Sequence, residues 1–314
     1  AMAVSSLEFG SHRFQGHETK FATTAGSSET PVVFVHGFGG CAEQWRAALE
    51  PGDFAIDLLG FGGSDKADVD YSIELWADQV LEFVDAKVPG KCFLVGNSIG
   101  SIVCLAAARK KPAALKGVAL FNVAVGTNSK ALPLSFREFL EWPAPILALP
   151  IFALLDVLLA SPLARPIFDK IRNTETVRNV LLKAVYKNAE RVDDDLVRMI
   201  TAPAEDPGAL GVFAKIFAGD PGDRPERIVD GIPADFPIAV FWGDEDVITP
   251  LAGPVAKFFR NLPTQRESAE FTILPGLGHC PFDDRPDTSL PPLRSWLREQ
   301  QEQNSAVEQE ATVV

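Results

Sequence analysis

Short apolar runs alternate along the chain with segments whose apolar residues recur at helical spacing. The runs at 31–35, 54–59, 92–95, 117–123, 237–242 and 269–274 are typical of strands buried in a parallel sheet. The segments at 72–88, 251–260 and 288–298 predict helices, and residues 9–24 alternate as an antiparallel hairpin would. Strands that alternate with helices in this way predict an α/β fold, with helices on both faces of a mostly parallel central sheet.

The alternation stops after residue 124 and resumes at 237, with a helical, proline-punctuated stretch between. We therefore divide the chain into a first core part (4–124), an inserted helical lid (125–236), a second core part (237–298) and a disordered tail (299–314) rich in Gln and Glu. Residues 142–163 are apolar and nearly long enough to span a bilayer. Their prolines and Asp156 favour an apolar lid instead.

Composition and charge exclude some classes of function. The chain has 314 residues, 46% of them hydrophobic, and a formal net charge of −13, which argues against binding to nucleic acid. The four cysteines form no Cys-x-x-Cys or His/Cys cluster, so we expect no metal and no cofactor. Residues 130–191 carry nine Lys/Arg and six Asp/Glu. This local excess fits a membrane-surface contact through the lid, although a solvated face explains it equally well.

The segment that follows the run at 92–95 reads GNSIG (96–100) and then continues as a helix. It matches the G-x-S-x-G nucleophile elbow, in which glycines allow a strand and a helix to approach closely. Ser98 would then lie at the end of a central strand and at a helix N-terminus, where developing negative charge is favoured. The context of the pentapeptide, more than the pentapeptide itself, predicts a nucleophilic serine.

A nucleophilic serine needs a base and a carboxylate that orients this base. Of the four histidines, only His279 lies in a loop directly after the last predicted strand. The loop after the preceding strand reads GDED (243–246), in which Asp246 is our candidate and Asp244 the second choice. The order Ser98, Asp246, His279 is that of the α/β-hydrolases. A serine in this place disfavours the related epoxide hydrolases and haloalkane dehalogenases, which attack with a carboxylate.

Further residues complete the predicted site. The backbone N–H groups of Phe38 and Ile99 are the candidates for the oxyanion hole, each worth about 3 kcal/mol. The candidates for substrate contact are Asn97, beside the nucleophile, and three apolar lid residues: Trp142, Leu147 and Phe152. A lid this apolar points to a lipophilic ester.

Five motifs carry a family resemblance: HGFGG (36–40), DLLGFGGSD (57–65), GNSIG (96–100), WGDEDVITPLAGP (242–254) and GLGHCPFDDRP (276–286). With the lid segment VYKNAERVDDDLV (185–197), they resemble the pheophytinase- and chlorophyllase-like α/β-hydrolases of plants, algae and cyanobacteria over nearly the whole chain. The elbow differs from that of land-plant chlorophyllases, which have a histidine before the serine.

The resemblance implies a chloroplast esterase that removes phytol from chlorophyll or pheophytin, with Ser98, Asp246 and His279 as its triad. Its partner would be the lipophilic pigment ester, and a transit peptide would be absent from this sequence. A cytoplasmic location is the alternative. The alternatives for function are a general lipid carboxylesterase and a non-catalytic receptor for a lipophilic ligand.

Overall fold

The computed structural model describes residues 6–128 and 164–313. Its centre is an eight-stranded sheet with the order β1-β2-β4-β3-β5-β6-β7-β8. The strands are β1 (Leu7–Phe14), β2 (His17–Thr24), β3 (Val32–Val35), β4 (Phe54–Ile56), β5 (Cys92–Asn97), β6 (Leu115–Phe121), β7 (Ile238–Gly243) and β8 (Ala269–Leu274). Strands β1 and β2 form an antiparallel hairpin, and β2 pairs with β4 in antiparallel register. The six strands from β3 to β8 are all parallel to one another.

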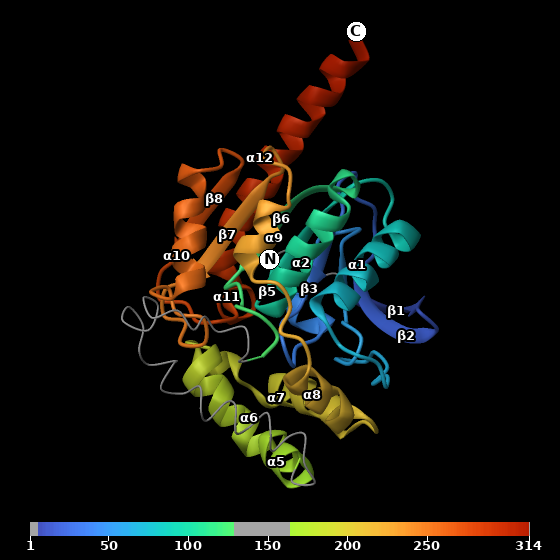
Figure 1. Ribbon diagram of the computed structural model, residues 1–314, viewed down its shortest axis with the longest axis vertical. Helices are drawn as coiled ribbons and strands as arrows, with labels where there is room; N and C mark the ends of the chain where they lie inside the picture. The colour runs from blue at the N-terminus through green and yellow to red at the C-terminus, as the bar shows by residue number, and fades with distance from the viewer. Residues whose placement is uncertain (1–5, 129–163, 314) are drawn as a thin grey trace.

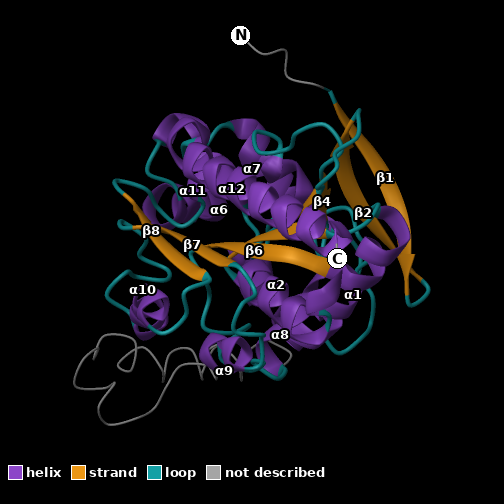
Figure 2. Ribbon diagram, turned by 90° about the horizontal axis from the view of Figure 1, so that it is seen from above, coloured by secondary structure: helices purple, strands orange, loops and turns teal. Residues whose placement is uncertain are grey.

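Helices cover both faces of this sheet (Figures 1 and 2). The core helices are α1 (Ile73–Lys87), α2 (Ile99–Lys110), α9 (Pro225–Asp230), α10 (Pro254–Asn261), α11 (Pro281–Asp284) and α12 (Pro286–Val313). In Figure 2, α1, α2, α9 and α10 lie on one side of the strands, and α11 and α12 on the other. The predicted α/β-hydrolase architecture, a mostly parallel sheet between helical layers, is therefore confirmed.

Side chains of the central strands alternate between the two faces of the sheet, and each face has its own hydrophobic core. In β3, Val33 and Val35 pack into the core under α1 and α2, whereas Val32 and Phe34 pack into the core with α11 and α12. The same division runs through β5, β6 and β7, because successive side chains of a strand point to opposite faces. Apolar residues on both faces explain why these runs read as continuous in the sequence.

The described part of the insertion between β6 and β7 is helical, as the sequence predicted. Its helices are α5 (Ala164–Ile171), α6 (Thr174–Val180), the π-helix η4 (Leu181–Val185), α7 (Asp194–Thr201) and α8 (Ala209–Ala218). In Figure 1 α5 to α8 lie together at the lower end of the molecule. Helix α9 instead contributes Ile228 and Val229 to the core with α1 and α2. The lid proper is therefore α5 to α8. In the described ranges, no helix is both long and apolar enough to cross a membrane.

The C-terminal segment differs from its prediction. We expected disorder from residue 299, but α12 continues to Val313 and rises away from the body of the molecule (Figure 1). Glu, Gln and Ala favour helix even where no apolar face packs against the protein. The lack of hydrophobic periodicity therefore indicates only that this segment is not buried. The intrinsic preference of its residues for helix is unaffected.

Candidate active site

Ser98 lies at the sharp turn between β5 and α2. Its backbone has φ 57° and ψ −120°, a strained conformation for a residue other than glycine. The flanking glycines are required by space, because a Cβ on Gly96 would lie 2.4 Å from the Gly100 carbonyl oxygen, and one on Gly100 would lie 2.3 Å from that of Val35. This is the geometry expected of a nucleophile elbow.

His279 and Asp246 form a buried pair in the two loops that follow β8 and β7. Nδ1 of His279 lies 2.7 Å from Oδ2 of Asp246, so Nδ1 carries the proton and donates a hydrogen bond to the carboxylate. Burial alone would raise the pKa of Asp246, but His279 and the Thr249 hydroxyl and amide together hold this pKa below its usual value. The alternative carboxylate, Asp244, is exposed and accepts the N–H of Gly276 instead.

Asn122, directly after β6, is a site residue that the sequence reasoning missed. Its Nδ2 donates to Oδ2 of Asp246 at 2.7 Å, and its Oδ1 accepts the N–H of Gly243 at 3.2 Å. The residue is fully buried with φ 45°, a conformation that asparagine tolerates better than most residues. Asn122 therefore holds the Asp246 carboxylate against the end of β7. Its position at the end of a central strand was the one available signal.

Asn97 joins the elbow to the histidine loop. Its Nδ2 donates to the backbone oxygens of His279 at 2.9 Å and Phe121 at 3.3 Å, and its Oδ1 accepts the thiol of Cys280 at 3.5 Å. Ser98 and His279 therefore lie at the same edge of the sheet. Asn97 lines the cavity described below, but its amide is engaged within the protein. We infer that it positions the loop, in addition to the substrate contact that we predicted.

The reacting atoms themselves are available. In the described part of the chain, neither Oγ of Ser98 nor Nε2 of His279 takes part in a hydrogen bond. The backbone N–H groups of Phe38 and Ile99 likewise donate to no other group among the described residues. Free donors at a helix N-terminus and in an adjacent loop are what an oxyanion hole requires.

His36 holds the candidate oxyanion loop, residues 36–40, which contains Phe38. Its Nδ1 lies 2.7 Å from the carbonyl oxygen of Gly37, and its Nε2 accepts the N–H of Leu58 at 3.0 Å. Both ring nitrogens are thus occupied, and complete burial lowers the pKa of His36. A neutral imidazole engaged on both sides cannot serve as the base.

A cavity of about 480 Å³ lies between this edge of the sheet and the lid. Its floor includes the oxyanion loop, Asn97 and Cys280, and its walls are mostly apolar residues of α5, α6, α7 and α8. Its two charged lining residues are paired with acids, Lys66 with Asp206 and Arg172 with Asp169. Trp142, Leu147 and Phe152, our other candidates for substrate contact, lie outside the described residues.

The lid is attached directly to the histidine loop. The backbone N–H of His279 donates to the carbonyl oxygen of Val185 at 2.9 Å. The Tyr186 hydroxyl then bridges two segments of the core, because it accepts the amide of Gln44 at 3.2 Å and donates to Asp283 at 2.6 Å. Arg191 pairs with the same carboxylate through Nε and Nη2. Burial raises the pKa of Asp283, and Arg191 and Tyr186 partly oppose this rise.

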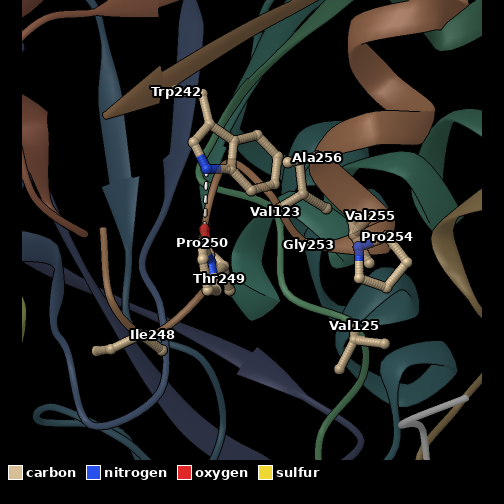
Figure 3. A pocket seen from close by; sticks show the side chains of 10 residues that line it. All are labelled: Val123, Val125, Trp242, Ile248, Thr249, Pro250, Gly253, Pro254, Val255 and Ala256. Carbon is tan, nitrogen blue, oxygen red and sulfur yellow. Dashed lines mark hydrogen bonds between the residues drawn. The ribbon is translucent and has the colours of Figure 1, made fainter. Parts of the chain in front are cut away.

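The loop that carries Asp246 is held from behind by Trp242. The indole N–H donates to the carbonyl oxygen of Thr249 at 2.9 Å, as the dashed line in Figure 3 shows. Around this contact is a small apolar cavity of about 50 Å³ between β7 and the start of α10. Apolar walls offer no partners for a water molecule, so this cavity is not a second polar site. Within the described ranges, no three His, Cys, Asp or Glu side chains are placed to share a metal ion.

The alpha/beta hydrolase family matches residues 32–289, and the chain belongs to this family. Chloroplastic pheophytinase of Arabidopsis thaliana is 27% identical over 245 residues, which cover 76% of this chain and 48% of that protein. The chain thus spans about half the length of this relative. An acetyltransferase component of the acetoin cleaving system of Pseudomonas putida is 27% identical over 270 residues, 84% of this chain and 62% of that protein.

Solved structures agree on the fold. A membrane phospholipase A described as a bacterial virulence factor superposes with a TM-score of 0.64 at 21% identity, over 94% of this chain and 87% of that one. An epoxide hydrolase superposes with a TM-score of 0.70 at 16% identity, over 94% and 99% of the two chains. Identities this low establish that the architecture is shared, but they do not show which reaction each protein catalyses.

Proposed function

We propose that this protein is a serine carboxylic-ester hydrolase that removes phytol from chlorophyll-type pigments. One observation carries the hydrolase part: Ser98, in a strained elbow, shares a sheet edge with the His279–Asp246 pair beside an apolar cavity. The pigment part is supported by the motifs shared with pheophytinases and by the 27% identity to the Arabidopsis protein. The same likeness supports a chloroplast location.

The proposed mechanism uses these residues in the following roles. Oγ of Ser98 attacks the ester carbonyl carbon while Nε2 of His279 accepts the hydroxyl proton, and Asp246 stabilises the imidazolium through Nδ1. The amides of Phe38 and Ile99 bind the tetrahedral oxyanion. Its collapse breaks the bond to the alcohol oxygen, which takes the proton from His279 and leaves as phytol. Water, deprotonated by His279, then attacks the acyl-enzyme and releases the chlorin acid from Ser98.

The cavity agrees with a substrate that has one long apolar arm. A volume of about 480 Å³ falls within the range of roughly 300–1,000 Å³ in which single drug-sized ligands bind. A chlorin ring and its phytyl chain together are larger than such a ligand. We therefore expect the cavity to enclose one part of the pigment ester and the other part to rest at its mouth. The mostly apolar lining favours the phytyl chain inside.

The test is direct hydrolysis. Purified protein is incubated with chlorophyll a and with pheophytin a, and chromatography follows the appearance of chlorophyllide and pheophorbide. We expect product with the wild type and none with Ser98→Ala. Labelling of Ser98 by an organophosphonate reports the nucleophile independently of the substrate. Absence of both labelling and turnover would support the alternative, a hydrolase-fold receptor for a lipophilic ligand.

The second candidate is a general lipid carboxylesterase, which the same apolar cavity also fits. Turnover of simple acyl esters without release of chlorophyllide or pheophorbide would favour this candidate over the pigment hydrolase. Competition separates the two further, because a pigment ester that occupies the cavity should slow the hydrolysis of a simple ester.

A further inference from the structure

Exposed large apolar side chains gather at the mouth of the cavity. In the described part of the chain seven such residues are exposed, and only Phe9, at 65%, lies elsewhere, on the edge strand β1. The other six form what we call the apolar rim: Phe38, Ile171, Val180, Leu182, Val247 and Ile248. Four of them also line the cavity, and Leu182 and Val247 are chain neighbours of lining residues.

Three separate segments contribute to the apolar rim. Phe38 comes from the oxyanion loop, and Val247 and Ile248 come from the loop that carries Asp246. Ile171, Val180 and Leu182 come from α5, α6 and η4, and the first two of these elements lie at the lower end of Figure 1. Single exposed apolar residues are ordinary on protein surfaces. Four exposed apolar residues that line one cavity, with two more beside lining residues in the chain, are typical of an interaction site.

The charge around the apolar rim indicates which partner fits. Residues 164–191, which contain α5, α6 and η4, carry seven Lys/Arg and three Asp/Glu, whereas residues 192–218 of the same lid carry two Lys/Arg and five Asp/Glu, so the positive excess is confined to the first part of the lid. Several of these cations are used in ion pairs, such as Arg191 with Asp283. Lys170 and Lys183 are exposed, form no ion pair in the described part of the chain, and lie next to Ile171 and Leu182. Apolar side chains beside unpaired lysines suit a surface with a hydrocarbon interior and anionic headgroups.

We propose that the apolar rim docks on an anionic lipid bilayer, with the cavity mouth facing the acyl chains. The substrate would then enter the cavity from the bilayer without crossing water. The entry route rests on the proposed hydrolysis of a lipophilic ester, whereas docking itself depends only on the surface. Docking can therefore be measured with Ser98→Ala protein, so that a failure of the pigment assay and a failure of docking are distinguishable.

The experiment is co-flotation of the full Ser98→Ala chain with phosphatidylcholine vesicles that contain or lack phosphatidylglycerol. We expect binding to the anionic vesicles. The double variant Leu182→Ser/Val247→Ser should weaken this binding at least tenfold, because neither side chain lines the cavity and both belong to the rim. Phe9→Ser is the control, since it removes an even more exposed apolar side chain on the edge strand β1, and it should bind as the parent does.

Substitution of Lys170 and Lys183 tests the attraction to anionic lipid headgroups. Lys170→Gln and Lys183→Gln should each weaken binding to the anionic vesicles by about fivefold and leave binding to phosphatidylcholine alone unchanged. Absence of flotation, or equal losses with Phe9→Ser, would overturn the proposal. Gel filtration gives the other contrary outcome: a dimer that the Leu182→Ser/Val247→Ser variant converts to monomer would assign the apolar rim to a second copy of the chain.

Discussion

The backbone N–H of His279 donates its hydrogen bond to the carbonyl oxygen of Val185, 2.9 Å away in the inserted segment. The candidate base is therefore positioned from two sides, by the Asp246 carboxylate on its ring and by the lid on its backbone. Such a contact makes the lid part of the geometry of the candidate active site. Changes in the lid should consequently affect the rate of the chemical step.

Gly278 tests this attachment. A Cβ at this position would lie 2.4 Å from the Val185 oxygen, so Gly278→Ala must displace the lid or the histidine loop. We expect at least a hundredfold loss of kcat, since small displacements of a catalytic group cost about this much. Gly211→Ala in α8 is the control, because its Cβ would meet nothing within 4 Å. The control should retain activity and gain about 1 kcal/mol of stability; equal rates for the two variants would contradict the prediction.

Tyr186 connects the lid to both sides of the site. Tyr186→Phe keeps the ring but removes the hydrogen bonds to Gln44 and Asp283, and we expect a loss of about 1–3 kcal/mol in the free energy of unfolding. We also expect a several-fold lower kcat with little change in KM. Tyr71→Phe, which loses one hydrogen bond to the Ala67 carbonyl, is the matched control for urea denaturation and kinetics. A larger effect in this control would refute the special role of Tyr186.

Asn122 should act through Asp246. Asn122→Asp keeps the size of the side chain but replaces the donor with a second carboxylate beside Oδ2 of Asp246, and we expect kcat to fall about a hundredfold or more. Asn122→Gly removes the amide and tolerates φ 45°, and it should cost about tenfold. Thermal unfolding of both variants separates positioning from folding. If the glycine variant matched the wild type in kcat and in its pH profile, Asn122 would have no positioning role.

We expect Asp53 to make the free energy of unfolding depend on pH. Its carboxylate is buried beside β3 and accepts the N–H groups of Val32 and Glu50, and burial raises its pKa to about 7. In the unfolded chain the pKa is near 3.9, so between about pH 4 and 7 the folded state binds more protons. The contribution of Asp53 to the free energy of unfolding should therefore fall as the pH rises through this range, by up to about 4 kcal/mol.

The comparison with Asp53→Asn isolates this effect. The variant cannot ionise, so its stability relative to the wild type should increase from about pH 4 to about pH 7 and stay constant above. Urea denaturation across the pH range measures the difference, and any constant cost of the lost acceptor cancels. A difference that does not change with pH would show that the pKa of Asp53 is the same in the folded and unfolded states.

The sequence predicted those parts of the site that lie at strand ends. Ser98, Asp246 and His279 each follow an apolar run, and the carboxyl ends of parallel strands meet at one edge of a sheet. The structure brings these loops together as expected. The need for glycine on both sides of Ser98 could also be predicted from the sequence, because it depends on local backbone geometry alone.

The residues that the sequence did not reveal depend on contacts between distant segments. The role of Asn122 exists because β6 and β7 are neighbours in the sheet, and its place directly after a strand is its only mark in the local sequence. The contact of Val185 with His279 joins η4 to the histidine loop, and no hydrophobic periodicity predicts that these two segments meet. The helical continuation of α12 was missed for another reason, since we equated the absence of an apolar face with the absence of structure.

The direction of α12 has a practical consequence. This helix ends at Val313 on the opposite side of the molecule from α5 and α6 (Figure 1). A fusion partner or immobilising tag attached through this end would lie on the side of the molecule away from α5 and α6, whereas an attachment on these inserted helices would lie beside residues that line the cavity.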